Sequence, residues 1–146
     1  MSTVTLTLEN AIAVITVNNP PINATSHVVR SGIVDVLDQI DANDDIRAAI
    51  LICDGKTFIA GADVSEFGQP PKAPILPDVI KRIEAATKPV IAAIHGHALG
   101  GGLEVALGCH YRIADSTAKL GLPEVNLGLI PGAGGTVRSP RLVPVA

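Results

Sequence analysis

Three consecutive glycines at 100–102 stand two positions before the carboxylate of Glu104, in the stretch GHALGGGLEVALGCH. We predict that this triplet lies where a strand leads into a helix, and the first N–H groups of a helix have no partner within it. Those groups carry the positive end of the helix, and glycine lets an oxygen approach them closely. The stretch therefore predicts a site for either a phosphate or a carbonyl oxygen.

The phosphate alternative fits the glycine patterns poorly. The dinucleotide motif GxGxxG fails because Val105 stands where a count from Gly100 needs the third glycine. The motif fails again at Val137 in the sequence GAGGTV, and no GxxxxGK[ST] sequence occurs. A nucleotide-binding domain is therefore the weaker hypothesis.

The carbonyl alternative gains support from a second glycine turn, FIAGAD, which ends at Asp63. Ala62 offers an N–H group directly after Gly61. N–H groups from two neighbouring strand ends can converge on one oxygen and form an oxyanion hole. On these residues alone, tight packing at both glycine turns is an equally open explanation.

The elements before these turns follow simple patterns. Alternating apolar and polar residues predict a hairpin with strands at 3–8 and 11–17. Apolar residues at helical spacing predict a helix from Ser26 to Asp41. Two continuous apolar runs, 48–55 and 88–96, predict strands that are buried on both faces.

Later elements continue the alternation of strands and helices. We expect a surface loop at 68–78, a helix at 78–86 capped by Asp78, a helix at 103–114 and a short strand near 119–120. Such alternation predicts an α/β fold with parallel strands and crossover helices. In these folds a ligand binds where the strands end in loops, which is where both glycine turns lie.

The composition excludes several classes of function. The 146 residues suit one modest domain, and a net charge of −3 offers no basic surface for nucleic acid. No apolar run is long enough to span a bilayer. The histidines lack helical i, i+4 pairing and the cysteines lack CxxC spacing, so we expect no metal site. Cys53 and Cys109 lie in apolar runs and are interpreted as buried thiols, which favours a reducing compartment.

Three motifs, GKTFIAGAD, HGHALGGGLEVALGCHYRIA and AKLGLPEVNLGLIPGAGGT, together resemble the enoyl-CoA hydratase/isomerase (crotonase) family. They occur in the family's order and spacing, and the similarity covers essentially the whole chain. The resemblance implies an α/β fold with the ββα spiral core of the ClpP/crotonase type. It implies one hydratase/isomerase-like domain over 1–146, incomplete before its C-terminal helices.

The resemblance also implies roles for individual residues. The N–H groups of Ala62 and Gly101 would hold the thioester carbonyl of an acyl-CoA. Glu104 would act chiefly on the attacking water and Glu124 on the α-proton. Acyl-CoA is then the substrate, and no cofactor is expected. Further substrate contacts are implied for Ala60, Gly61, Asp63, Gly100 and Pro123.

The implied reaction is the syn addition of water across a 2-enoyl-CoA double bond in fatty-acid β-oxidation. Two carboxyls on one side of the substrate can share the proton transfers, and their repulsion favours one shared proton. The same pair could move a proton between the α and γ carbons, which is 3-enoyl to 2-enoyl isomerisation.

Each of these residues also has a structural explanation. Glu104 would be favourable in the first turn of any helix, and Glu124 could be a solvent-facing loop carboxylate. Asp63 could cap a following helix. Arg138 is expected to tie the GAGGT turn to its surroundings, and the histidines beside the glycine triplet are expected to serve packing or to lie at the surface.

NPPINA and CDGKTFIAGADVSEFG are most similar to the hydratase portion of multifunctional β-oxidation enzymes, in which a 3-hydroxyacyl-CoA dehydrogenase portion follows. The resemblance also implies further C-terminal helices that cover the acyl pocket and make subunit contacts. Without them we expect weak or absent activity from this chain alone and an exposed apolar surface that drives association, and we also expect homo-oligomers. The alternative function is a non-catalytic acyl-CoA-binding or assembly module. The implied location is the cytoplasm in a bacterium and the peroxisome in a eukaryote.

Overall fold

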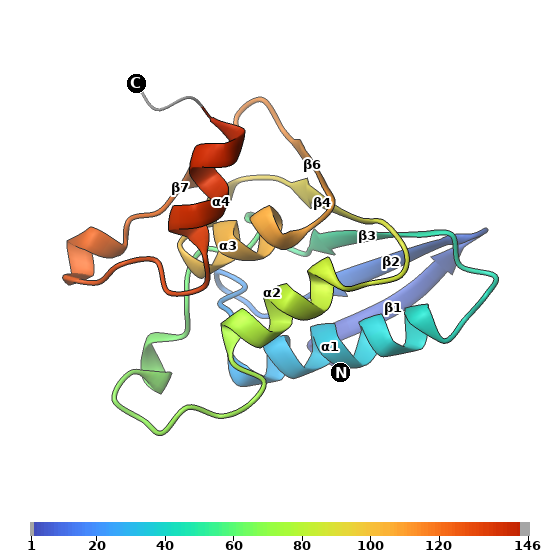
Figure 1. Cartoon of the computed structure of the whole chain (residues 1–146), viewed down its shortest axis with the longest axis horizontal. Helices are drawn as coiled ribbons and strands as arrows, with labels where there is room; N and C mark the ends of the chain where they lie inside the picture. Colours follow the sequence, from blue (N-terminus) through green and yellow to red (C-terminus); the bar gives the residue numbers. More distant parts are fainter. Residues whose placement is uncertain (1, 144–146) are drawn as a thin grey trace.

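A mixed β-sheet forms the centre of the computed structural model, which describes residues 2–143 (Figure 1). Its strands are β1 (Val4–Glu9), β2 (Ile12–Val17), β3 (Ala48–Cys53), β4 (Val90–Ile94) and β6 (Tyr111–Ala114). They lie in the order β1-β2-β3-β4-β6. The first pair is antiparallel and the other three are parallel, which confirms the predicted α/β arrangement.

The N-terminal hairpin forms where the alternating pattern predicts it. Its pairing ends with Glu9 opposite Ile12, so Asn10 and Ala11 alone make the turn. Asn10 has a φ of 56°, in the left-handed region that asparagine tolerates better than most residues. The tight turn leads β2 directly into the parallel part of the sheet.

Helices α1 (His27–Asp41) and α2 (Leu76–Glu84) lie side by side along one face of the sheet (Figure 1). α1 begins after Ser26, whose hydroxyl accepts a hydrogen bond from the N–H of Val29 at 3.5 Å. The predicted helix at 26–41 is thus confirmed to within one residue. The apolar positions that set its periodicity are buried: Val29, Ile33, Val36, Leu37 and Ile40.

Strands β3 and β4 are fully buried on one face only, which corrects the prediction of two buried faces. In β3, Ala49 and Leu51 are buried, whereas Ile50 and Ile52 are half-buried. β4 alternates in the same way. Successive side chains of a strand point to opposite faces, so the helices that cover one face bury only every second residue. The continuous apolar runs therefore predicted burial on two faces, whereas only one face of these strands is fully buried.

α2 begins two residues before the predicted start, so Asp78 is not its N-cap residue. Asp78 is instead the third helical residue, and its Oδ2 accepts a hydrogen bond from the N–H of Ile75 at 3.1 Å. Pro77 is compatible with this start because the first turn of a helix needs no N–H donor there. The loop that precedes α2 lies at the surface, as predicted.

The predicted helix at 103–114 is wrong in its second half. Helix α3 runs from Gly101 to Gly108, and the chain then turns into strand β6. Tyr111 pairs with Ile91 and Ala114 with Ile94, so this segment completes the parallel edge of the sheet. The boundary between the two elements was missed because four strand residues are too few to show a period of two.

A second, two-stranded sheet joins β5 (His97–Leu99) to β7 (Lys119–Gly121) in parallel. Strand β7 was predicted, whereas β5 was not separated from the preceding apolar run. The described chain is completed by the short 3-10 helices η1 (Val64–Glu66) and η2 (Glu124–Leu127) and by helix α4 (Gly135–Leu142).

The core is aliphatic, as the low aromatic content predicts, with Phe58 as its one fully buried aromatic side chain among residues 2–143. Cys53 and Cys109 are both buried and free, so the thiol interpretation is confirmed. Burial raises the pKa of the Cys109 thiol to about 12, although the nearby Arg112 opposes the shift. Burial, with the negative charge of Asp54, also raises the pKa of Cys53. Both thiols are therefore inert in the folded chain.

Candidate active site

The two glycine turns lie next to each other because their strands are bridged. Ala60 and Leu99 form an isolated parallel β-bridge, and the N–H of Leu99 donates to the carbonyl of Ile59 at 3.1 Å. Ala62 and Gly101 each lie two residues beyond the bridged pair. This pairing is the structural reason why the two predicted donors reach the same end of the fold.

The peptide between Gly61 and Ala62 has a defined orientation. The carbonyl oxygen of Gly61 accepts hydrogen bonds from the N–H of Thr25 at 3.1 Å and from its hydroxyl at 3.4 Å. In a planar trans peptide the N–H points opposite to the carbonyl, so the N–H of Ala62 points away from Thr25. That N–H donates to no acceptor among residues 2–143.

The peptide between Gly100 and Gly101 is oriented by helix α3. The carbonyl of Gly100 accepts the first helical hydrogen bond, from the N–H of Glu104 at 3.0 Å. The N–H of Gly101 therefore points out of the helix N-terminus, and within the described residues it has no acceptor. Gly100 has a φ of 54°, which favours glycine at this turn.

Both free N–H groups belong to residues that line one cavity of about 260 Å³. Apolar side chains line much of the rest, among them Ile22, Phe67 and Leu127. Two N–H donors that face a largely apolar space can hold one carbonyl oxygen and stabilise negative charge on it. Seven of the predicted site residues line this cavity: Ala60, Gly61, Ala62, Gly100, Gly101, Pro123 and Glu124.

The three glycines of the triplet serve different purposes. A Cβ at Gly102 would overlap the carbonyl oxygen of Ile59, so this glycine permits the close packing of α3 on the segment that leads into the first glycine turn. A Cβ at Gly101 would lie 2.8 Å from a methyl of Leu76. The packing explanation therefore holds for two of the glycines, and it coexists with a free N–H at Gly101.

Glu124 places its carboxyl group at the cavity wall. Its Oε1 lies 3.2 Å from the position that a Cβ on Gly100 would occupy. Its Oε2 is buried and accepts no hydrogen bond from the described residues. A buried carboxyl oxygen without a partner is costly, so a substrate or water is expected to use it. The alternative of a solvent-facing loop carboxylate does not fit this burial.

Glu104 is also buried, at 2% exposure, but it does not line the same cavity. Its Oε1 accepts hydrogen bonds from the N–H groups of Ala133 and Gly135, both at 2.8 Å. These donors come from the glycine-rich loop and the first residue of α4. The loop thus compensates the buried carboxylate with two backbone donors and with the positive end of a helix. The structure thus places Glu124 at the cavity, whereas Glu104 does not line it.

The remaining predicted residues have structural partners. Asp63 caps η1, where hydrogen bonds from Ser65 lower the pKa of its carboxyl group, and it lies outside the cavity. Arg138 donates to the carbonyl of Ala133 at 3.0 Å and pairs with Glu84, as expected for a residue that secures the glycine-rich turn. His97 is exposed. None of these residues lines the cavity.

Sequence reasoning missed the residues that hold the first turn in place. Thr25 and Arg30 are both buried, and Arg30 donates to the carbonyl of Thr25 at 2.7 Å. Asn23 is buried too, and its amide donates to the carbonyls of Asp54 and Thr57 at 2.8 and 3.0 Å. One signal was present, because Arg30 falls on the apolar face of α1, where a charge predicts a buried partner.

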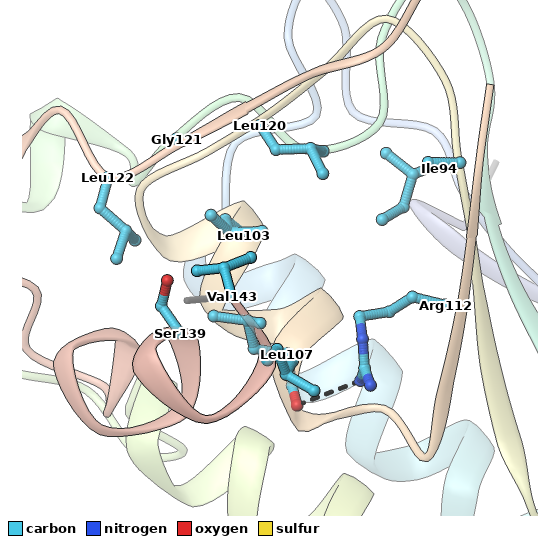
Figure 2. Close-up of a pocket in the computed structure, with 11 residues that line it drawn as sticks. Ile94, Leu103, Leu107, Arg112, Leu120, Gly121, Leu122, Ser139 and Val143 are labelled. Atoms are coloured by element: carbon cyan, nitrogen blue, oxygen red, sulfur yellow. Dashed lines mark hydrogen bonds between the residues drawn. The ribbon is translucent and has the colours of Figure 1, made fainter. Parts of the chain in front are cut away.

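A second cavity, of about 480 Å³, lies among α3, β6, β7 and α4 (Figure 2). Its lining is mainly aliphatic, and its one charged side chain among the described residues, Arg112, donates to the carbonyls of Leu107 and Cys109 at the end of α3. It contains none of the predicted site residues. The smaller cavity, with its two donors and a carboxyl group, is therefore the candidate active site.

Over residues 2–143, no cluster of three or more His, Cys, Asp or Glu side chains has the geometry to hold a metal ion. Within the same residues, no helix has both the length and the apolar character needed to cross a bilayer.

Known proteins resemble the chain over almost its whole length. A "Probable enoyl-CoA hydratase" of Bacillus subtilis is 45% identical over 153 residues, which cover 100% of this chain and 59% of that protein. The human "Peroxisomal bifunctional enzyme" is 50% identical over 141 residues, or 94% of this chain and 19% of the enzyme. The chain thus spans only part of the length of these relatives.

A solved structure agrees with this similarity. The crystal structure of an enoyl-CoA hydratase from Bacillus anthracis superposes with a TM-score of 0.89 at 35% identity, over 99% of this chain and 59% of that one. The sequence model of the enoyl-CoA hydratase/isomerase family matches residues 7–146. This chain belongs to the enoyl-CoA hydratase/isomerase family, and its fold is that of the crotonases.

Proposed function

We propose that this chain carries the thioester-binding and proton-transfer centre of an enoyl-CoA hydratase. The observation that supports the proposal most directly is the pair of unpartnered N–H groups, at Ala62 and Gly101, on one largely apolar cavity. A thioester carbonyl placed between them gains two hydrogen bonds that strengthen as its oxygen becomes negative. Relatives named enoyl-CoA hydratases add support from sequence.

Addition of water to a 2-enoyl thioester requires two proton transfers. The water loses a proton as its oxygen bonds to the β-carbon, while the α-carbon of the enolate gains one. In our proposal, Glu104 accepts the proton of the water and Glu124 delivers the proton to the α-carbon. The Oε2 of Glu124 is available for that transfer, because no described residue donates a hydrogen bond to it.

Two finer features of the reaction belong to the same proposal. If both carboxyl groups face one side of the substrate, water and proton add syn, which hydration in deuterated water with NMR analysis of the product would establish. The pair could also move a proton between the α and γ carbons and isomerise a 3-enoyl-CoA. Isomerisation needs no attacking water, so it would depend more on Glu124 than on Glu104.

The proposal extends to the rest of the natural protein and to its cellular compartment. Several relatives are peroxisomal bifunctional or multifunctional β-oxidation proteins, which supports a dehydrogenase portion further along the natural chain. Two free buried thiols fit a reducing compartment, namely the cytoplasm of a bacterium or the peroxisome of a eukaryote. Acyl-CoA would be the substrate, with no cofactor.

The test compares ligands and then turnover. Acetoacetyl-CoA should raise the melting temperature of the chain, because its thioester and keto oxygens mimic the enolate, whereas NAD should not. Hydration of crotonyl-CoA should be measurable but slow. Stabilisation by NAD alone would contradict the proposal.

A non-catalytic acyl-CoA-binding module is the second candidate. The observation that favours it is the absence of Glu104 from the cavity lining. It predicts the same stabilisation by acetoacetyl-CoA without any hydration of crotonyl-CoA above the rate in buffer.

A further inference from the structure

The side chain of Arg30 is buried although it carries a charge, with 7% of the residue exposed. Its guanidinium donates hydrogen bonds to three other segments of the chain. Buried charges are rare unless they are paired and hydrogen-bonded, and here each guanidinium nitrogen donates at least one hydrogen bond. The acceptors are the carbonyls of Thr25 at 2.7 Å, Pro74 at 2.8 Å and Lys72 at 3.3 Å, and Oε2 of Glu66 at 2.9 Å.

Thr25 connects Arg30 to the candidate oxyanion hole through hydrogen bonds. Its N–H and its hydroxyl both donate to the carbonyl of Gly61, which fixes the direction of the Ala62 N–H. The same hydroxyl lies 3.4 Å from the position that a Cβ on Gly101 would occupy. Thr25 therefore hydrogen-bonds to the Ala62 turn and makes no hydrogen bond to the Gly101 turn, while its own carbonyl is held by Arg30.

The far side of the Ala62 turn is held through Glu66. Its Oε2 pairs with Arg30 at 2.9 Å, and its Oε1 accepts the N–H of His27, the first residue of α1, at 2.6 Å. Glu66 lies in η1, which begins directly after Asp63. The turn is thus fixed to α1 on both sides, and Arg30 takes part in both connections.

We infer that Thr25 and Arg30 are positioning residues for the Ala62 N–H donor, an inference that rests on the proposed function. Neither lines the 260 Å³ cavity, so they act through the Gly61–Ala62 peptide. The Gly101 donor is oriented by its own helix and is independent of them. A displaced donor loses much of its effect, because a shift of about 1 Å in a catalytic group can lower a rate by roughly 10²-fold.

The experiment follows the amide resonances of Ala62 and Gly101 by ¹H–¹⁵N NMR during titration with acetoacetyl-CoA. In the unsubstituted chain both amide protons should move downfield. Thr25→Val keeps the shape and removes the hydroxyl, whereas Thr25→Ser keeps the hydroxyl and removes a methyl. We expect Thr25→Val to reduce the Ala62 response, leave the Gly101 response and raise the Kd by roughly tenfold. Thr25→Ser should restore the Ala62 response.

The outcomes separate this inference from the proposed function. If neither amide responds in the unsubstituted chain, the oxyanion hole fails and the inference fails with it. If both respond and Thr25→Val behaves like the unsubstituted chain, or loses both responses equally, only the positioning role is overturned. Arg30→Lys provides a second arm if Thr25→Val does not fold. It keeps the charge but cannot reach all four acceptors, so it should weaken the Ala62 response alone, and an unchanged response would overturn the inference.

Discussion

The two candidate catalytic carboxyl groups differ in how the protein accommodates them. Glu104 is held by two backbone N–H groups, whereas Oε2 of Glu124 is buried and has no donor among the described residues. A carboxylate with two donors contributes to stability as well as to chemistry. A carboxyl oxygen without a donor costs stability and is retained for another reason, which we take to be proton transfer.

This difference predicts two distinct effects of the same substitution. Glu104→Gln and Glu124→Gln should each lower crotonyl-CoA hydration by roughly 10²- to 10⁴-fold, because each removes a proton carrier. Only Glu104→Gln should also lower the free energy of unfolding, by about 1–2 kcal/mol, because its two hydrogen bonds lose their charge. Steady-state rates and urea denaturation measure both effects.

The control is Glu9→Gln at an exposed position on β1, which should change neither quantity. Unaltered hydration in both active-site variants would show that the carboxyl groups have been assigned the wrong roles.

At the residue scale, each predicted site residue lies within a short motif, so the sequence could place it next to a glycine turn. Ala62, Gly101 and Glu124 all line the cavity. The surroundings of Glu104 could not be predicted, because its donors lie 29 and 31 residues further along the chain. Thr25 was missed for the same reason, since its contact with Gly61 spans 36 residues.

At the scale of elements, local periodicity was enough for the hairpin and α1, where side-chain spacing reports burial directly. It failed at the end of α3, because the four residues of strand β6 are too few to show a period of two. The packing of α3 against Ile59 depends on Gly102, and this contact between residues distant in sequence could not be predicted from a local pattern.

Gly102→Ala should therefore disturb the whole site. Its Cβ would overlap the backbone carbonyl of Ile59, which cannot move aside as a flexible side chain could. We expect a loss of roughly 3 kcal/mol in unfolding free energy, or failure to fold. Gly132→Ala is the matched control, since its Cβ would meet no atom within 4 Å. Equal stability of the two variants by thermal denaturation would argue against this packing.

Helices α2 and α4 are joined by an ion pair that also supports the loop around Glu104. Arg138 donates to both carboxyl oxygens of Glu84, at 2.7 and 2.8 Å, and to the carbonyl of Ala133. These hydrogen bonds lower the pKa of Glu84 below its usual value. The pair therefore stabilises the fold above the unfolded pKa of about 4.3, and this contribution disappears as pH falls through the lower folded value.

The expected effect is small, because 43% of the Glu84 side chain is exposed. At neutral pH, Glu84→Gln should lower the free energy of unfolding by up to about 1 kcal/mol, and below the folded pKa of Glu84 the difference should vanish. Urea denaturation across this pH range measures it. A difference that persists in acid would mean that the ion pair is not its source.

At the scale of the whole molecule, the exposed apolar side chains gather in the last part of the described chain, from β6 onward (orange to red in Figure 1). Ile113 is 68% exposed on the edge strand β6, and Ile130 is 81% exposed after η2. Such surfaces in a globular protein mark regions that contact other surfaces. The composition predicted an apolar core, but only the structure shows which apolar residues remain outside it.

We therefore expect the chain to associate in a concentration-dependent manner. Replacing Ile113 and Ile130 together by Lys should shift the population toward monomer, because each substitution replaces an exposed apolar side chain by a charged one. Light scattering after size-exclusion chromatography measures the mass. The control is Leu8→Lys, at an exposed apolar position on the opposite edge strand β1. A monomer at all concentrations in the unsubstituted chain would contradict this expectation.

We propose that the N–H groups of Ala62 and Gly101 together hold one thioester oxygen. The ¹³C NMR shift of butyryl-CoA labelled at its thioester carbonyl tests this directly, since this saturated ligand binds without reacting. We expect a downfield shift of the bound carbonyl carbon, because two donors draw electron density toward the oxygen. If the ligand binds, as shown by saturation of the titration, and its carbonyl carbon keeps the shift of free butyryl-CoA, the two N–H groups do not hold the thioester oxygen.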